Sequence, residues 1–235
     1  MSVFTYHLVR TSFIAAIKAI LLPPSPKNTP GLIHVECMTA MTLGSAVFSP
    51  SRLLLNQVAV FAQWENEASI DEFLEKDDFG KMLAKGWHTR LSFLRQWGKI
   101  TEFDIPDETV EIDELNAPVV AVTLARMKLL QVPRFIHWGR PVEKLVRDHP
   151  GATLSLASIR FPNTVSTFSV WKSQKEMTDM VSGHSDIPQP KRHIDAMKER
   201  DRKDFHFEFT TLRFKPLSEH GEWRGRSNWI PDLNR

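Results

Sequence analysis

The chain has 235 residues, of which 42% are hydrophobic, 10% aromatic and 25% charged, and these values are ordinary for a globular protein. They exclude disordered, collagen-like and disulfide-scaffold proteins. Thirty Lys and Arg against 28 Asp and Glu give a formal net charge of +2. Because the basic residues are scattered, nucleic acid is not expected as the main partner. The single cysteine, Cys37, cannot form an intrachain disulfide, so we expect a cytoplasmic protein.

The chain opens with a predicted strand over residues 3–9 and an apolar helical run, Phe13–Leu22, which ends before Pro23 and Pro24. This run is far shorter than the roughly 20 residues that span a bilayer. Its flanks do not resemble a secretory signal either. With Lys18 as its only charge the run is weakly amphipathic. The sequence therefore favours a buried helix, with peripheral membrane contact as the alternative.

An internal repeat organises the rest of the chain. VAVFAQW at 58–64 recurs as VSTFSVW at 165–171, with the Val, Phe and Trp all displaced by 107 residues (171−64). After each Trp, apolar residues follow six, nine and ten positions later, which is one face of a helix. Before each copy a Pro-Gly pair, at 30–31 and 150–151, opens a strand-like run. The two halves therefore carry the same elements in the same order.

That order is strand, helix, strand, strand, helix, strand, which is the ferredoxin-like unit. We expect the closing strands at Lys99–Phe103 and at Phe205–Phe214, and an acidic linker containing Pro106. The predicted organisation is a first half over 1–103, a linker over 104–117, a second half over 118–226 and a tail over 227–235. The fold class is α+β, with two tandem ferredoxin-like units forming an internally duplicated α/β barrel and helices outside. A homodimer is left open, since the duplication already supplies the partner unit.

Several classes of enzyme have no motif here. The sequence contains no glycine-rich phosphate loop, no Gly-x-Ser-x-Gly, no His-Glu-x-x-His and no Cys-x-x-Cys. Nucleotide-binding, hydrolase and zinc sites therefore have no positive support.

The second half resembles a known family. The run from Pro150-Gly151 through the FSVWKS segment at 168–173, the histidine His193, and the ending RFKPLSEHGEW at 213–223 are similar to the C-terminal half of spheroidene monooxygenase, a haem-containing carotenoid oxygenase. The spacing of 20 residues between His193 and Arg213 (213−193) agrees with the family pattern. The first half agrees mainly through AQWENEA at 62–68.

The resemblance implies a barrel of the dimeric α/β-barrel superfamily that binds haem b and its iron in the C-terminal half. It also implies a monooxygenase-like oxidoreductase acting on an apolar small molecule, carotenoid-like or otherwise lipophilic. Related haem barrels, such as chlorite dismutases, dye-decolorising peroxidases and aldoxime dehydratases, also use a histidine as axial ligand. This analogy is to the fold, and the function has to be argued from the site.

His193 is the expected iron ligand. It lies in the first turn of a helix predicted for residues 191–203, where the helix dipole disfavours the imidazolium form. His193, Ala196, Met197 and Arg200 share one helical face, and the small alanine leaves room for a flat macrocycle. The residues alone equally fit a histidine on an exposed, charged helix.

Other candidates stay open. His88, in a segment interpreted as the matching helix of the first half, is the rival ligand. Arg126 and Arg134 flank the start of the second half's first helix and could bind the haem propionates, because a guanidinium matches a carboxylate. Alternative functions are a haem-dependent dehydratase or peroxidase, a haem-binding protein, and a cofactor-free barrel monooxygenase.

Overall fold

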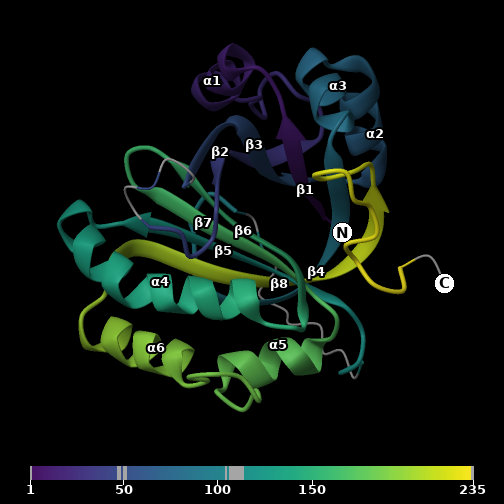
Figure 1. Ribbon diagram of the computed structural model, residues 1–235. Helices are drawn as coiled ribbons and strands as arrows, with labels where there is room; N and C mark the ends of the chain where they lie inside the picture. The colour runs from purple at the N-terminus through teal and green to yellow at the C-terminus, as the bar shows by residue number, and fades with distance from the viewer. Residues whose placement is uncertain (1, 47–48, 50–51, 104, 106–113, 234–235) are drawn as a thin grey trace.

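A computed structural model describes residues 2–46, 49, 52–103, 105 and 114–233. Eight antiparallel strands form a closed barrel in the order β1-β3-β2-β6-β7-β5-β8-β4 (Figure 1). The strands are β1 Val3–Arg10, β2 Leu32–Met41, β3 Leu53–Trp64, β4 Trp87–Lys99, β5 Val119–Met127, β6 Ala152–Arg160, β7 Thr164–Trp171 and β8 His206–His220. This confirms the predicted fold class, an α+β duplicated barrel.

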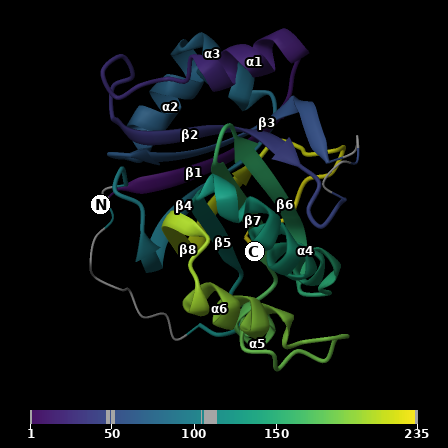
Figure 2. The ribbon, with the colours of Figure 1, turned by 90° about the vertical axis from the view of Figure 1, so that its left-hand side faces the viewer.

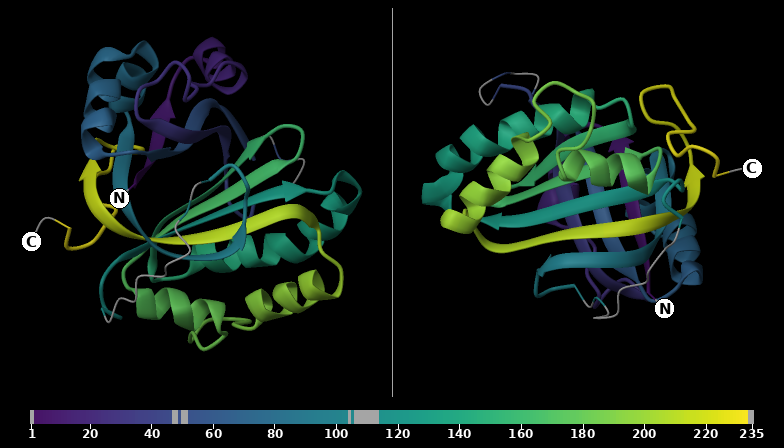
Figure 3. Two further views of the ribbon diagram at one scale, coloured as in Figure 1. Left: turned by 180° about the vertical axis from the view of Figure 1, so that it is seen from behind. Right: turned by 90° about the horizontal axis from the view of Figure 1, so that it is seen from below.

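The helices lie outside the barrel in two groups, one for each half (Figure 2). They are α1 Phe13–Leu21, α2 Glu67–Lys76, α3 Asp78–Ala84, α4 Val132–Asp148, α5 Gln174–Val181 and α6 Arg192–Arg202, with a short 3₁₀ helix, η1, at Leu129–Gln131. Figure 3 shows α4, α5 and α6 together against one face of the barrel. Among the described residues, none of these helices has the length and apolar character that crossing a membrane requires.

The strand registers repeat between the halves. Val3 pairs with Trp64 across β1 and β3, and Val119 pairs with Trp171 across β5 and β7. Both tryptophans are buried, and each indole N–H donates to a hydroxyl, that of Thr5 at 3.0 Å or that of Ser169 at 2.8 Å. The sequence repeat is thus a repeat of strand pairing and of side-chain packing.

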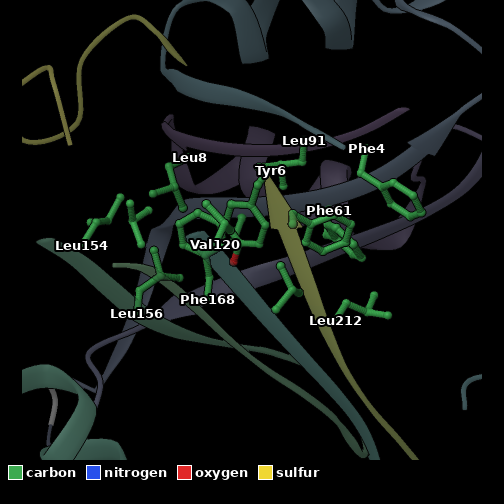
Figure 4. Packing of buried hydrophobic residues seen from close by; sticks show 14 of the residues in the cluster. Phe4, Tyr6, Leu8, Phe61, Leu91, Val120, Leu154, Leu156, Phe168 and Leu212 are labelled. Atoms are coloured by element: carbon green, nitrogen blue, oxygen red, sulfur yellow. The ribbon is translucent and has the colours of Figure 1, made fainter. Parts of the chain in front are cut away.

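The halves meet through two strand pairs, β2 with β6 and β4 with β8. Apolar side chains from both halves fill the barrel, and Figure 4 shows Tyr6 and Phe168 facing each other from the two halves. Their ring centroids lie 3.8 Å apart. Beyond β8 the chain folds back, and Ile230, which is 3% exposed, packs against the same core.

A buried ion cluster also joins the halves. Glu36 of β2 is 1% exposed and forms ion pairs with Arg126 of β5 and with Arg160 of β6, the latter at 2.9 Å. His34 contacts the same carboxylate at 3.1 Å. Although burial alone would raise the pKa of Glu36, its bonds to His34 and Arg126 hold that pKa at about 2. Arg126 is therefore committed to a contact between the halves.

Two element predictions in the first half are wrong. The segment containing His88 is not helical, because α3 ends at Ala84 and residues 87–99 form β4. Leu91 and Phe93, two residues apart, both belong to the barrel core, as the two-residue period of a strand requires. Gly86 makes the change of direction possible, since a Cβ there would lie 2.2 Å from the carbonyl oxygen of Leu8. Residues 101–103, predicted as part of a closing strand, form a turn.

The expectation that the helix at Phe13–Leu22 is buried is also wrong. In α1 only Ala16 and Ala19 are buried, and most of the bulky side chains are exposed. Of the predicted linker, residues 104 and 106–113 lie outside the described residues.

Candidate functional site: an apolar cavity in the second half

A cavity of about 460 Å³ lies between the outer face of the second-half sheet and the helices α4, α5 and α6. This volume is in the usual range for small-molecule sites. Its walls are mainly aromatic and aliphatic side chains: Phe135, Trp138, Val142, Val146, Trp171, Met177, Met180, Val181, Phe205 and Phe209. A cavity with these walls favours an apolar ligand, and the few polar groups along it determine how that ligand is held.

His193 of α6, the predicted iron ligand, lines the cavity. Its Nδ1–H donates to the carbonyl oxygen of Val181 at 3.1 Å, and no described residue hydrogen-bonds to Nε2. Burial lowers the pKa of His193, although the bond to Val181 opposes that shift. Burial therefore favours the neutral ring, and Nδ1 orients it while Nε2 has no hydrogen bond from the described residues. This is the usual arrangement of a histidine that binds a metal.

The predicted helical face of α6 is present. Ala196, Met197 and Arg200 all line the cavity together with His193. The Arg200 guanidinium stacks over the ring of Phe209 at 4.2 Å, and its buried Nε has no hydrogen-bond partner in the described part of the chain. Arg200 therefore presents a positive charge to an apolar space.

Arg213 of β8 places a second guanidinium against the cavity. It stacks on Trp97 at 4.4 Å, and within the described ranges no carboxylate pairs with it. Burial, and the neighbouring charge of Arg95, lower the pKa of Arg213 to about 10. Arg213 is still protonated at neutral pH, so this cation too has no partner in the described protein and is available to an anionic group of a ligand.

Sequence reasoning missed His206, to which it assigned no role. His206 begins β8, is 4% exposed and lines the cavity. Its Nδ1 bonds the Asp204 carboxylate at 2.8 Å, and its buried Nε2 has no partner among the residues described. Burial lowers the pKa of His206 although Asp204 raises it. The Asp-Phe-His sequence at 204–206 was the available signal, since a carboxylate two residues away can orient an imidazole.

The two other arginines predicted to bind a cofactor do not line the cavity. Arg126 pairs with Glu36 in the buried cluster described above. Arg134 of α4 pairs with Glu199 at 2.7 Å and donates to the carbonyl oxygen of Lys203 at 2.9 Å. It therefore holds α4 against α6 and supports the cavity from behind.

His88, the rival ligand, lies elsewhere. It stacks between the rings of His7 and His220, with centroids 5.0 Å and 4.8 Å away. Burial, aided by the positive charge of neighbouring groups, lowers the pKa of His88 to about 4. The candidate site is therefore the second-half cavity.

No protein-family model and no curated protein sequence matches the chain. Solved structures similar to the chain include a ferredoxin-fold protein related to antibiotic biosynthesis monooxygenases from Listeria monocytogenes. It has 12% identity, a TM-score of 0.31 and coverage of 92% of this chain and 96% of that one. A heme-degrading enzyme from Listeria monocytogenes has 10% identity, a TM-score of 0.29 and coverage of 88% and 98%. Chlorite dismutase from Candidatus Nitrospira defluvii has 8% identity, a TM-score of 0.28 and coverage of 92% and 91%. Likeness at this level concerns the fold and assigns no reaction to this chain.

Proposed function

We propose that the protein binds haem b in the second-half cavity and serves as a monooxygenase-like oxidoreductase for an apolar small molecule. His193 is the residue that would hold the iron, through Nε2. The observation that carries this proposal is the state of His193. Burial lowers the pKa of its ring, its Nδ1–H donates to the carbonyl oxygen of Val181, and no described residue hydrogen-bonds to its Nε2. The residue lines an apolar cavity.

The other lining residues suit the same group. Haem is a flat, largely apolar macrocycle with two carboxylates. The aromatic and aliphatic walls accept its faces, and the small side chain of Ala196 leaves room one turn along α6 from His193. Arg213 offers a cation with no acidic partner among the described residues. Arg200 offers a second cation, whose charge also acts on the Asp204 carboxylate. Unpaired cations in an apolar cavity are expensive unless a ligand brings the negative charge.

The chain's own residues have separate tasks in the proposed reaction. When bound, haem would supply oxygen or peroxide chemistry. The apolar walls exclude water and hold a lipophilic substrate. His206, oriented by Asp204, can hold or release a proton at Nε2. The resemblance of the RFKPLSEHGEW ending to spheroidene monooxygenase supports oxygenation.

The Asp204–His206 pair favours a second candidate function, a cofactor-free oxygenase or isomerase-type barrel. A buried imidazole bonded to a carboxylate is an acid–base group that works without a metal. In that case the cavity would hold only the substrate, and haem would not bind.

A haem titration of the purified protein tests the proposal. Wild-type protein is expected to give a Soret band at one haem per chain, and His193→Ala to lose the ligand's spectroscopic signature, with added imidazole restoring it. His206→Ala and the exposed control His137→Ala should keep that signature. The absence of a Soret band in the wild type, or its loss only in His206→Ala, would overturn the assignment of His193.

A further inference from the structure

Helix α1 packs in the opposite sense to an ordinary amphipathic helix. Its small residues Ala16 and Ala19, 1% and 2% exposed, contact the barrel. Its bulky residues face solvent, with Ile14 78% exposed and Leu21 71% exposed. The exposed apolar face, which we call the α1 face, comprises Phe13, Ile14, Ile17, Leu21 and Leu22. An apolar surface of this kind on a small helix normally has a partner.

The charge pattern indicates which partner. Lys18 lies four residues after Ile14 and three before Leu21, so it stands within the α1 face. Arg10, before the helix, and Lys27, after it, are also exposed. Residues 1–35 contain no Asp or Glu. The helix and its flanks therefore combine bulky apolar groups with positive charge only.

Most acidic residues of the neighbouring helices α2 and α3 already form ion pairs or cap a helix, so they do not neutralise the positive charge of the α1 face. Glu67 and Asp71 pair with Arg90, Glu72 pairs with Lys76, and Asp78 pairs with Lys81. Asp77 caps the N-terminus of α3. The positive charge along the α1 face therefore stays available to an external partner.

We propose that the α1 face docks on an anionic lipid bilayer, with the helix axis in the plane of the interface. In that position the side chains of Ile14 and Leu21 enter the acyl boundary, and the long stem of Lys18 extends its ammonium to the lipid phosphates. A second copy of the chain is a poorer occupant. An isologous contact through this face would place Lys18 near its own symmetry mate, with no acid in the segment to pair with it.

This surface is separate from the cavity. Figure 1 shows α1 at the opposite end of the molecule from α4, α5 and α6. The proposal therefore does not depend on haem binding, and the two fail independently. The His193→Ala variant should therefore bind lipid vesicles as strongly as the wild type does.

A second exposed apolar group provides a matched control. Leu130 is 94% exposed and Phe207 is 69% exposed, and both lie where the ends of β5 and β8 meet. Charges of both signs adjoin that site, namely the acids Asp204 and Glu208 and the base Lys128, whose Nζ lies 6.0 Å from the centre of the Phe207 ring. Charge therefore favours the α1 face over this one, although both expose large apolar side chains.

The test is co-sedimentation with vesicles of phosphatidylcholine, with and without phosphatidylserine. The wild type is expected to bind the mixed vesicles, and Ile14→Glu/Leu21→Glu to lose about a hundredfold in partition coefficient. Lys18→Gln should lower binding to mixed vesicles about fivefold, with no change on neutral ones. Leu130→Glu should bind as the wild type does. Ile14, Lys18, Leu21 and Leu130 are all exposed, so circular dichroism should show unchanged folding of these variants.

Three outcomes would overturn the proposal. The first is no vesicle binding by the folded wild type. The second is loss of binding in Leu130→Glu with retention in the Ile14/Leu21 variant, which would place the contact at the other end. The third is a dimer in sedimentation that the Ile14/Leu21 variant dissociates, which would make a second copy the occupant.

Discussion

The buried carboxylate of Glu36 is expected to be a major source of stability, because it joins three groups from both halves of the barrel. Replacing it by glutamine keeps its shape and removes its charge, which leaves Arg126 and Arg160 without their shared anion. The pKa of Glu36 falls from the ordinary 4.5 to about 2 in the folded protein, a difference of about 2.5 (4.5−2). At about 1.4 kcal/mol per pKa unit this corresponds to about 3 kcal/mol. Breaking one side of a buried pair typically costs about 3–5 kcal/mol, so the two estimates agree.

Urea unfolding at several pH values checks this. Because the folded pKa lies below the unfolded one, the contribution of Glu36 is complete above pH 4.5 and is lost as the pH falls toward 2. The difference between wild type and Glu36→Gln should therefore be about 3 kcal/mol at neutral pH and shrink in acid. The control Glu67→Gln removes an exposed partner of Arg90 and should cost less than about 1 kcal/mol. A difference that does not vary with pH, or one no larger than the control's, would refute this account of the cluster.

Three further predictions concern the cavity. Arg213→Leu should weaken haem binding but leave the free energy of unfolding unchanged or raise it by about 1 kcal/mol. The reason is that it removes a buried cation with no carboxylate partner in the described ranges. A destabilised variant in denaturant titration would contradict this. Ala196→Leu should lower haem affinity about tenfold by filling space, with the ligand's spectrum retained. Haem affinity should stay constant as the pH falls to 6.5, the ordinary pKa of histidine, and decline only below it, because burial lowers the pKa of His193. A loss of affinity that begins above pH 6.5 would contradict this.

The sequence predicts most of the fold because the repeat lies in its most regular elements. The strands that end at Trp64 and Trp171 carry the same Val, Phe and Trp, each displaced by 107 residues (171−64), so the repeat is visible without a structure. The error around His88 arose where a helix passes into a strand at Gly86 with little change in composition. The error at α1 has a different cause. A run rich in large apolar residues has a high average hydrophobicity and so predicts burial. Only the three-dimensional structure shows that the alanines are the residues that face inward.

The site was harder to predict, because its groups come from separate elements. His193 and Arg200 lie on one helix, so their common face follows from helical spacing. His206 and Arg213 are seven residues apart on β8, and their place along one cavity depends on how α4, α5 and α6 cover the sheet. Arg126 adjoins the second half's first helix in sequence, but its strand turns it toward Glu36 of the other half. Such partners are decided by tertiary contacts that no local pattern contains.

The two halves share one topology but differ in what lies under their helices, and the reason is visible in the connections. In the first half α3 begins two residues after α2 ends, and Gly80 lets the backbones approach so closely that a Cβ there would lie 1.9 Å from the carbonyl oxygen of Phe73. Phe73 then packs on Trp64 with ring centroids 5.0 Å apart, and the space between these helices and the sheet is filled.

In the second half the position of Phe73 is held by Met180 (73+107), and residues 182–191 separate α5 from α6. That insertion lets α6 pair with α4 through Arg134 and Glu199 and stand away from the sheet. The cavity is therefore a product of the longer connection, and shortening 182–191 should close it.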